Sequence, residues 1–209
     1  GESDYAFIRR LLEDAGISFY FDADSQVVLN DAPERNDPRP PLPFADAGLL
    51  RRDDHVSRVR LRRVVKPGVA TLQDHDLLQS DRYRLEGQAK IDGDSHEAQL
   101  EGFYFEPGAF NFEDDGTAGP SLPTRDARGR FRRLENEGQR AAERQLAAIR
   151  SAARRIQLHA NAPDLRPGTV MSIVGHPHDW VREDRRLLVL RSVLHGAHDR
   201  PTQLQCEAV

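Results

Sequence analysis

The chain has 209 residues, of which 38% are hydrophobic and 31% are charged, and it carries a net charge of −4 with a pI of about 6.1. This length supports one large domain or two small ones with a hydrophobic core, and the acidic balance argues against a nucleic-acid-binding domain. No segment approaches the roughly 20 consecutive apolar residues that cross a bilayer, and a single cysteine, Cys206, excludes an internal disulfide.

Charge is distributed unevenly along the sequence. Residues 91–116 hold eight acidic residues and no Lys or Arg, whereas residues 56–66 hold five basic residues and no acidic ones. Residues 125–155 hold ten Arg against four acidic residues. Segments of opposite charge favour complementary contacts, either within the fold or between copies of the chain. The alternative is that each segment is a solvated surface without a partner.

The first thirty residues predict a helix followed by a β-hairpin. Ser3 is a suitable N-cap and Gly16 is suited to end the helix. The apolar residues that recur at helical spacing between them are Tyr5, Ile8, Leu11, Leu12 and Ala15. Residues 17–21 and 26–30 are strand-like and flank a polar four-residue turn. We expect the apolar face of the helix to pack on this hairpin.

A basic strand follows a proline-rich connector. Residues 33–43 contain five prolines, which predict a connector without regular structure that separates two units. Residues 56–65 then alternate between basic and apolar side chains, as in a half-buried strand. The basic positions, which we take as a candidate interface with an acidic partner, are Arg58, Arg60 and Arg62. The alternative is an exposed edge strand that its charges protect from unwanted pairing.

The middle of the chain predicts strands and then a long helix. Residues 69–76, 83–91 and 98–105 have the composition and alternation of strands. Residues 111–130 are rich in Gly, Pro and Asp, which predicts a mobile loop. A helix over about 131–155 is predicted from an apolar stripe formed by Leu134, Ala141, Ala142, Gln145, Leu146, Ile149, Ala152, Ala153 and Ile156.

The C-terminal third predicts strands separated by tight turns. Pro167 and Gly168 form a turn that leads into a strand over residues 169–174. Two further apolar segments, residues 187–190 and 192–195, follow a loop that contains Gly175, His176 and Pro177. Residues 202–208 alternate, which places the Cys206 thiol on the buried face of a terminal strand. A buried structural cysteine is favoured over a reactive one.

Metal-binding and catalytic patterns are weak. Side chains that could supply metal ligands are His176, His178, Asp179, His195, His198 and the Asp74-His75-Asp76 triplet. Their spacing matches no zinc motif, and the sequence has no nucleophile elbow, Walker loop or dinucleotide fingerprint. We therefore predict no catalytic residues, no cofactor and no metal. A structural hydrogen bond is a sufficient role for His176.

Several short motifs, in the same order, resemble the hub region of VgrG, the spike protein of type VI secretion, which is related to tailed-phage baseplate hubs. The segments that carry the resemblance are residues 2–8, 10–13, 16–17, 28–33, 70–77, 100–110 and 165–195. Together they span nearly the whole chain, from residue 2 to residue 195. The resemblance implies an α+β fold with mainly antiparallel β structure. It also implies a small helix-plus-hairpin subdomain over residues 1–55 and a β-barrel hub domain over residues 56–209 that is crossed by one long helix.

The same resemblance implies a structural hub and not an enzyme. A VgrG hub is a homotrimer that meets an Hcp-like tube protein, carries a spike domain and delivers effectors. Compared with such a hub, this chain is a fragment that lacks the first barrel and the spike. We expect assembly in the bacterial cytoplasm and then secretion by the type VI apparatus without a signal peptide, with no binding of nucleic acid and no membrane insertion by this fragment.

Three other functions stay open. The chain could be a metal-dependent hydrolase domain of a secreted particle, with metal ligands among His176, His178, His195 and His198. It could be an adaptor that carries an effector on the loop 111–130. Phage tails and other contractile particles use similar hubs, so it could also belong to a phage tail.

Overall fold

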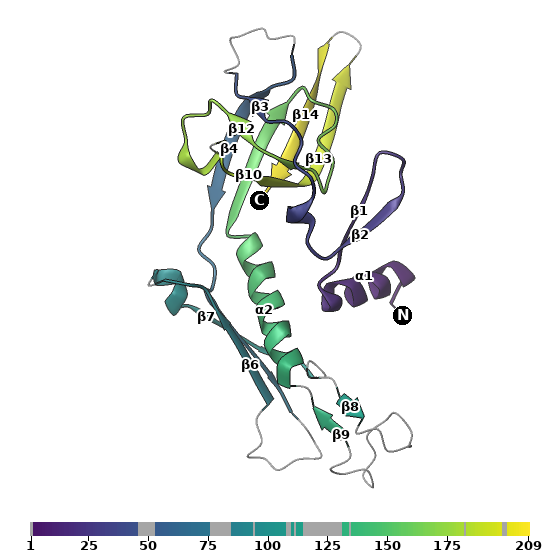
Figure 1. Ribbon diagram of the computed structural model, residues 1–209, viewed down its shortest axis with the longest axis vertical. Coiled ribbons are helices and arrows are strands. Elements are labelled where there is room, and N and C mark those ends of the chain that lie inside the picture. The colour runs from purple at the N-terminus through teal and green to yellow at the C-terminus, as the bar shows by residue number, and fades with distance from the viewer. Residues whose placement is uncertain are drawn as a thin grey trace. The chain divides into compact units, whose positions relative to one another are not determined.

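The computed structural model describes residues 2–45, 53–75, 85–93, 95–107, 110, 112–114, 131–133, 135–181, 183–197 and 200–209. The chain forms two compact units, one that joins Gly1–Val64 to Arg154–Val209 and one that spans Val65–Ala153 (Figure 1). In the described part of the chain, two α-helices accompany mostly antiparallel strands, so the predicted α+β class is confirmed. The boundary predicted from the family resemblance, 1–55 against 56–209, stays a prediction. None of the helices in the described part is long and apolar enough to span a membrane.

The predicted helix and hairpin are present at the N-terminus. Helix α1 (Asp4–Ala15) begins where Ser3 Oγ accepts a hydrogen bond from the Ala6 N–H, and it ends at Gly16, whose φ of 73° is left-handed. Strands β1 (Ser18–Phe21) and β2 (Val27–Asn30) pair antiparallel. The helix contacts the hairpin as expected, with the rings of Tyr5 and Phe19 edge-on and their centres 6.4 Å apart, but no residue of α1 is buried. A hairpin of two four-residue strands is too small to cover its apolar face.

The proline-rich connector is part of the first unit and does not separate units as predicted. It forms a short 3-10 helix η1 (Pro33–Arg35) and then β3 (Leu42–Pro43), which pairs in parallel with β12 (Ile173–Val174). The Arg39 N–H donates to Val170 O at 3.0 Å, and Leu42 is only 2% exposed. The prolines limit the backbone hydrogen bonds of this segment, but its remaining N–H groups still attach it to the strand that follows the Pro167-Gly168 turn.

The first unit is built on a five-stranded antiparallel sheet. Its order is β11 (Val170–Met171), β13 (Leu187–Ala197), β14 (Arg200–Ala208), β10 (Arg154–Ala160) and β4 (Val56–Arg63). One face of this sheet is the core, with Leu158, Met171, Val189 and Cys206 at most 1% exposed. The two segments predicted at 187–190 and 192–195 form one strand, and the predicted strand 169–174 is split into β11 and β12.

Strand β10 corrects the predicted helix. Helix α2 covers Glu135–Ser151, not 131–155, and Ile156 belongs to a strand that lies between β14 and β4. Residues 131–133, predicted as the start of the helix, form strand β9. The misassignment has a simple cause, because Ala152, Ala153 and Ile156 continue the helical spacing, while Ile156, Leu158 and Ala160 also have the two-residue period of a buried strand face.

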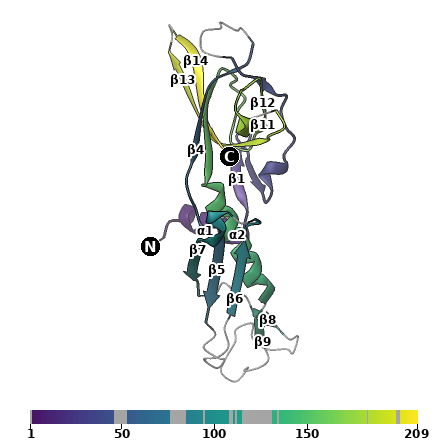
Figure 2. The ribbon, with the colours of Figure 1, turned by 90° about the vertical axis from the view of Figure 1, so that its left-hand side faces the viewer.

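The second unit packs α2 on a three-stranded sheet of order β6-β5-β7 (Figure 2). Strand β5 (Val69–Asp74) pairs antiparallel with β6 (Leu85–Lys90) and in parallel with β7 (Glu101–Phe105). Between β6 and β7 lies the 3-10 helix η2 (His96–Gln99). Strand β8 (Phe112–Asp114), which pairs with β9 (Phe131–Arg133), is the described part of the predicted mobile loop, and the rest lies outside the described residues.

Helix α2 contacts β6 and β5 of its own unit. Its buried side chains Ala142 and Leu146 pack against Ala70, Leu72 and Ala89 of the sheet. Near its C-terminal end, Arg150 forms an ion pair of 2.9 Å with Glu97, whose side chain is only 8% exposed. A closed barrel crossed by a helix is not seen among the described residues. The five-stranded sheet ends at β11 and β4, and single bridges join these two strands to the connector and to the residue that follows it, Val170 to Pro38 and Val56 to Phe44.

Candidate functional site

The predicted interface residues lie on the outer strand of the five-stranded sheet. In β4, Arg58, Arg60 and Arg62 are exposed, whereas Val59 and Leu61 pack against the core. The two-residue period of the strand therefore separates the charged and apolar side chains, as predicted.

The pairing register adds basic residues from two other strands to this surface. Arg62 is paired with Arg155, and Arg58 with His159, both on β10. Across β14, Glu207 is paired with both Gln157 of β10 and Arg191 of β13, which places Arg191 on the same face. We call this surface the basic face; its cationic and titratable residues are Arg58, Arg60, Arg62, Arg155, His159, Arg191 and His195.

Charge on the basic face is strongly biased. Among the described residues it carries five guanidinium groups and one carboxylate, that of Glu207, whose Oε1 lies 3.7 Å from Arg155 Nε. The remaining positions are mostly polar, and a shallow hollow of about 160 Å³ lies between Gln157, Arg191 and Gln205. A broad, open and cationic sheet face suits an acidic protein surface better than a small molecule.

Sequence reasoning identified three of these five arginines. Arg155 was missed because it was assigned to a helix, and Arg191 because the register across β13 and β14 was unknown. A usable signal was present in residues 155–160, where Arg155, Gln157 and His159 alternate with Ile156, Leu158 and Ala160.

An aromatic cap lies at one end of the same sheet. The Arg63 and Arg154 guanidinium carbons lie 5.8 and 5.2 Å from the centre of the Trp180 ring system, and their Cα atoms are paired across β4 and β10. Trp180 belongs to the short 3-10 helix η4 (Asp179–Val181), whose Val181 is fully buried. Two cation–π contacts thus hold this loop over the edge of the core.

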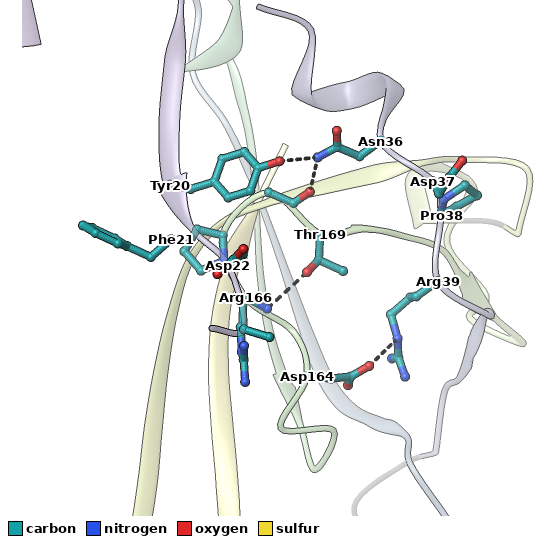
Figure 3. Close-up of a pocket in the computed structure, with 13 residues that line it drawn as sticks. Tyr20, Phe21, Asp22, Asn36, Asp37, Pro38, Arg39, Asp164, Arg166 and Thr169 are labelled. Carbon is teal, nitrogen blue, oxygen red and sulfur yellow. Dashed lines mark hydrogen bonds and ion pairs between the residues drawn. The ribbon is translucent and has the colours of Figure 1, made fainter. Parts of the chain in front are cut away.

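A pocket of about 480 Å³ lies where the hairpin, the connector and the Pro167-Gly168 turn meet (Figure 3). The Asn36 side-chain amide donates to Tyr20 Oη at 2.9 Å and to Gly168 O at 2.8 Å. Arg39 Nε lies 3.1 Å from Asp164 Oδ2 and forms an ion pair with it. The geometry of this contact is not that of a hydrogen bond. The charge of Arg39 is balanced by Asp54 and Asp164, and the hydrogen bonds of Asn36 make this pocket a structural joint.

The candidate metal ligands do not come together in the described part of the chain. No group of three or more His, Cys, Asp or Glu there could hold a metal ion. His176 Nδ1 accepts from the His178 N–H, and His178 Nδ1 accepts from the Trp180 N–H. Burial, and then the charge of His178, lower the pKa of His176. Asp76 and His198 lie outside the described residues.

Cys206 is buried in the core of the first unit, as predicted. Its exposed fraction is 1%, and its Sγ lies 4.0 Å from Leu165 O. Burial raises the pKa of the thiol to about 11. Since the thiolate is the nucleophile, this position is chemically protected in the folded chain.

We expect Cys206 to resist alkylation until the first unit unfolds. With a pKa of about 11, only about one thiol in a thousand is ionised at pH 8. Iodoacetamide at pH 8, followed by mass spectrometry, should modify the native chain at least about 100-fold more slowly than the denatured chain. The matched control is Gln205→Cys with Cys206→Ser, which moves the thiol to the exposed face. Equal native rates for the two chains would contradict a buried thiol.

Comparison with known proteins gives a family and a fold. The family model described as phage tail baseplate hub (GPD) matches residues 1–200. Among curated proteins, none matches the chain.

Solved tail proteins share the fold at low identity. A tail protein from Neisseria meningitidis MC58 has a TM-score of 0.61 and 13% identity, over 100% of this chain and 54% of that protein. The 43 kDa tail protein of prophage MuSo2 from Shewanella oneidensis has a TM-score of 0.56 and 10% identity, over 100% and 55%. The chain thus spans about half the length of these two proteins.

A secretion protein is also similar. A component of the E. coli type VI secretion system, itself described as structurally similar to the bacteriophage T4 tail proteins gp27 and gp5, has a TM-score of 0.52 and 14% identity. That match covers 100% of this chain and 37% of the other. At these identities the three structures show the fold alone.

Proposed function

Because this chain belongs to the phage tail baseplate hub (GPD) family, whose model matches residues 1–200, we propose that it is part of the structural hub at the base of the spike of a contractile injection machine. That family match is the observation that carries the proposal. The fold shared with phage tail proteins and with a type VI secretion component supports it.

The basic face is the surface that we assign to assembly. Arg58, Arg60 and Arg62 are exposed, and Arg155 is partly exposed. The carboxylate of Glu207 compensates only part of the positive charge of the face. Like charges in adjacent strands, such as Arg62 beside Arg155, cost free energy in an isolated sheet. Such a cost is offset when an acidic surface covers the face, so we expect the partner to carry carboxylates.

The machine and its partners follow from the same proposal. The full-length protein forms a homotrimer, and its hub joins a VgrG-type spike to an Hcp-like tube protein and delivers effectors. It is assembled in the bacterial cytoplasm and secreted by a type VI apparatus. A phage tail is the alternative particle, and the identity of the tube protein that the hub binds distinguishes the two.

Charge reversal of the outer strand tests this assignment. In the full-length protein, Arg58→Glu, Arg60→Glu and Arg62→Glu together should weaken both self-assembly and co-sedimentation with the tube protein by about tenfold or more at low salt, because each change replaces attraction to an acidic partner by repulsion. Native mass spectrometry and sedimentation measure the two results.

The matched control reverses the same number of charges elsewhere on the first unit. Arg9, Arg185 and Arg186 are exposed and lie off the five-stranded sheet. Their reversal to Glu should leave assembly unchanged. If the strand variant assembles like the wild type, the basic face is not an assembly surface. If the wild-type full-length protein binds no tube protein at all, the hub function itself fails.

A further inference from the structure

Two exposed strand edges of complementary character lie in different units of the chain. Strand β4 ends the five-stranded sheet and β7 ends the three-stranded sheet. From Arg58 to Arg63, β4 has backbone pairing only with β10 among the described residues, and β7 has backbone pairing only with β5. An unpaired edge of this kind is a template on which another strand can add.

The edge strand β7 is unusually apolar on its outer face. Phe103 and Phe105 are 59% and 57% exposed, whereas Tyr104 between them packs against the α2 side of the sheet. Glu101 shares the outer face, where its carboxylate accepts a hydrogen bond from the Thr71 hydroxyl. Large apolar side chains exposed on an edge strand mark a surface that a partner covers.

The side chains of the two edges match in period and in chemistry. Along β4 the outward side chains are three guanidinium groups at alternate positions, and along β7 they are a carboxylate and two phenyl rings at alternate positions. Guanidinium groups bind both partners, as ion pairs with carboxylates and as cation–π contacts with aromatic rings. Cross-strand pairs of this kind stabilise the addition of one strand to another.

We propose that β7 of one copy of this chain adds to the free edge of β4 of a second copy, so that Arg58, Arg60 and Arg62 face Glu101, Phe103 and Phe105. This pairing deepens the proposed hub function and rests on it for the assembly in which the copies meet. The acidic and aromatic partner of the basic face is then a second copy of the same chain.

Charge selects this pairing over the symmetric ones. Pairing β4 of one copy with β4 of another would place two rows of arginines side by side, which is destabilising. Pairing β7 with β7 would leave the arginines of β4 without a partner. A contact between different surfaces of identical chains is heterologous, and such contacts close into rings when the rotation between copies allows it.

Irreversible cross-linking between two variants that each carry one added cysteine tests the pairing. Arg60→Cys chains are mixed with size-tagged Phe105→Cys chains and treated with a short bis-maleimide at pH 7, at which the buried Cys206 does not react. The control replaces Phe105→Cys by Glu86→Cys, because Phe105 and Glu86 flank the same residue, Gln73, on opposite edges of one sheet. Mixed dimers should form at least about tenfold faster with Phe105→Cys than with Glu86→Cys.

A charge-reversal variant is the second part of the cross-linking test. Glu101→Arg in the Phe105→Cys chain should reduce the mixed dimer several-fold, because it opposes a cation to the arginine row. Equal rates for the two cysteine positions, an absence of mixed dimer, or no effect of Glu101→Arg would each overturn the strand pairing. If the full-length protein binds the tube protein but the mixed dimer does not form, the strand pairing is wrong and the proposed hub function is still supported.

Discussion

Gly87→Ala should destabilise the second unit by about 3 kcal/mol, although alanine is ordinarily the better residue within a strand. A Cβ atom at residue 87 would lie 2.3 Å from Gly138 O and 2.5 Å from Gly138 C, which are backbone atoms of α2. A side chain could rotate away from such a collision, but a helix backbone has to move as a whole. The helix and β6 would therefore separate and lose the packing of Leu146 against the sheet.

Thermal unfolding of the second unit, followed by circular dichroism, measures this effect. For a unit of this size, a loss of about 3 kcal/mol corresponds to a midpoint lower by roughly 12 to 24 °C. The matched control is Glu86→Ala on the same strand, which is exposed and should change the midpoint little. An unchanged or higher midpoint for Gly87→Ala would show that β6 and α2 are not in close contact.

Gly168→Ala should loosen the hairpin from the first unit at a cost of about 2 to 4 kcal/mol. Two effects add at this position. The φ of 87° is left-handed, which costs about 1 kcal/mol or more for alanine. The new Cβ would also lie 2.5 Å from the Tyr20 ring, whose hydroxyl accepts the hydrogen bond from Asn36. Displacement of that ring breaks the joint drawn in Figure 3.

Gly175→Ala separates the two effects. Its φ of 79° is also left-handed, but nothing lies within 4 Å of a Cβ built there. It should therefore cost only the backbone term, about 1 kcal/mol. Hydrogen exchange of β1 and β2 amides should accelerate in Gly168→Ala and stay unchanged in Gly175→Ala. Equal effects of the two substitutions would mean that Tyr20 does not pack on the turn.

The exposed face of α1 shows why a local signal alone does not place an element. The sequence predicts the helix, its Ser3 cap and its Gly16 end, and all three are present. It also predicts burial, because Tyr5 and Ile8 are apolar, yet they are 64% and 54% exposed. Amphipathic spacing indicates which face seeks a partner, whereas only the tertiary structure shows whether this chain provides one.

Family and fold class were accessible from the sequence because ordered motifs survive when most residues differ. The comparisons confirm a relation to baseplate hubs, while the type VI assignment, the trimer and the tube partner remain proposals. The crossed barrel implied by the resemblance is not seen in the described residues, where α2 packs on the three-stranded sheet of its own unit.

By itself the sequence determined features that depend on a few neighbouring residues: the α1 cap, the left-handed turn at Gly168, the alternation of Arg58, Arg60 and Arg62, and the burial of Cys206. Caps, turns and strand periods are set by local backbone geometry, so they can be inferred without knowing the fold. Only the tertiary structure decided that residues 154–160 form a strand, that β7 runs parallel to β5, and that Arg155 and Arg191 join the basic face. Those features depend on which distant segments pair and in which register, and a shift of one residue would move every side chain to the other face.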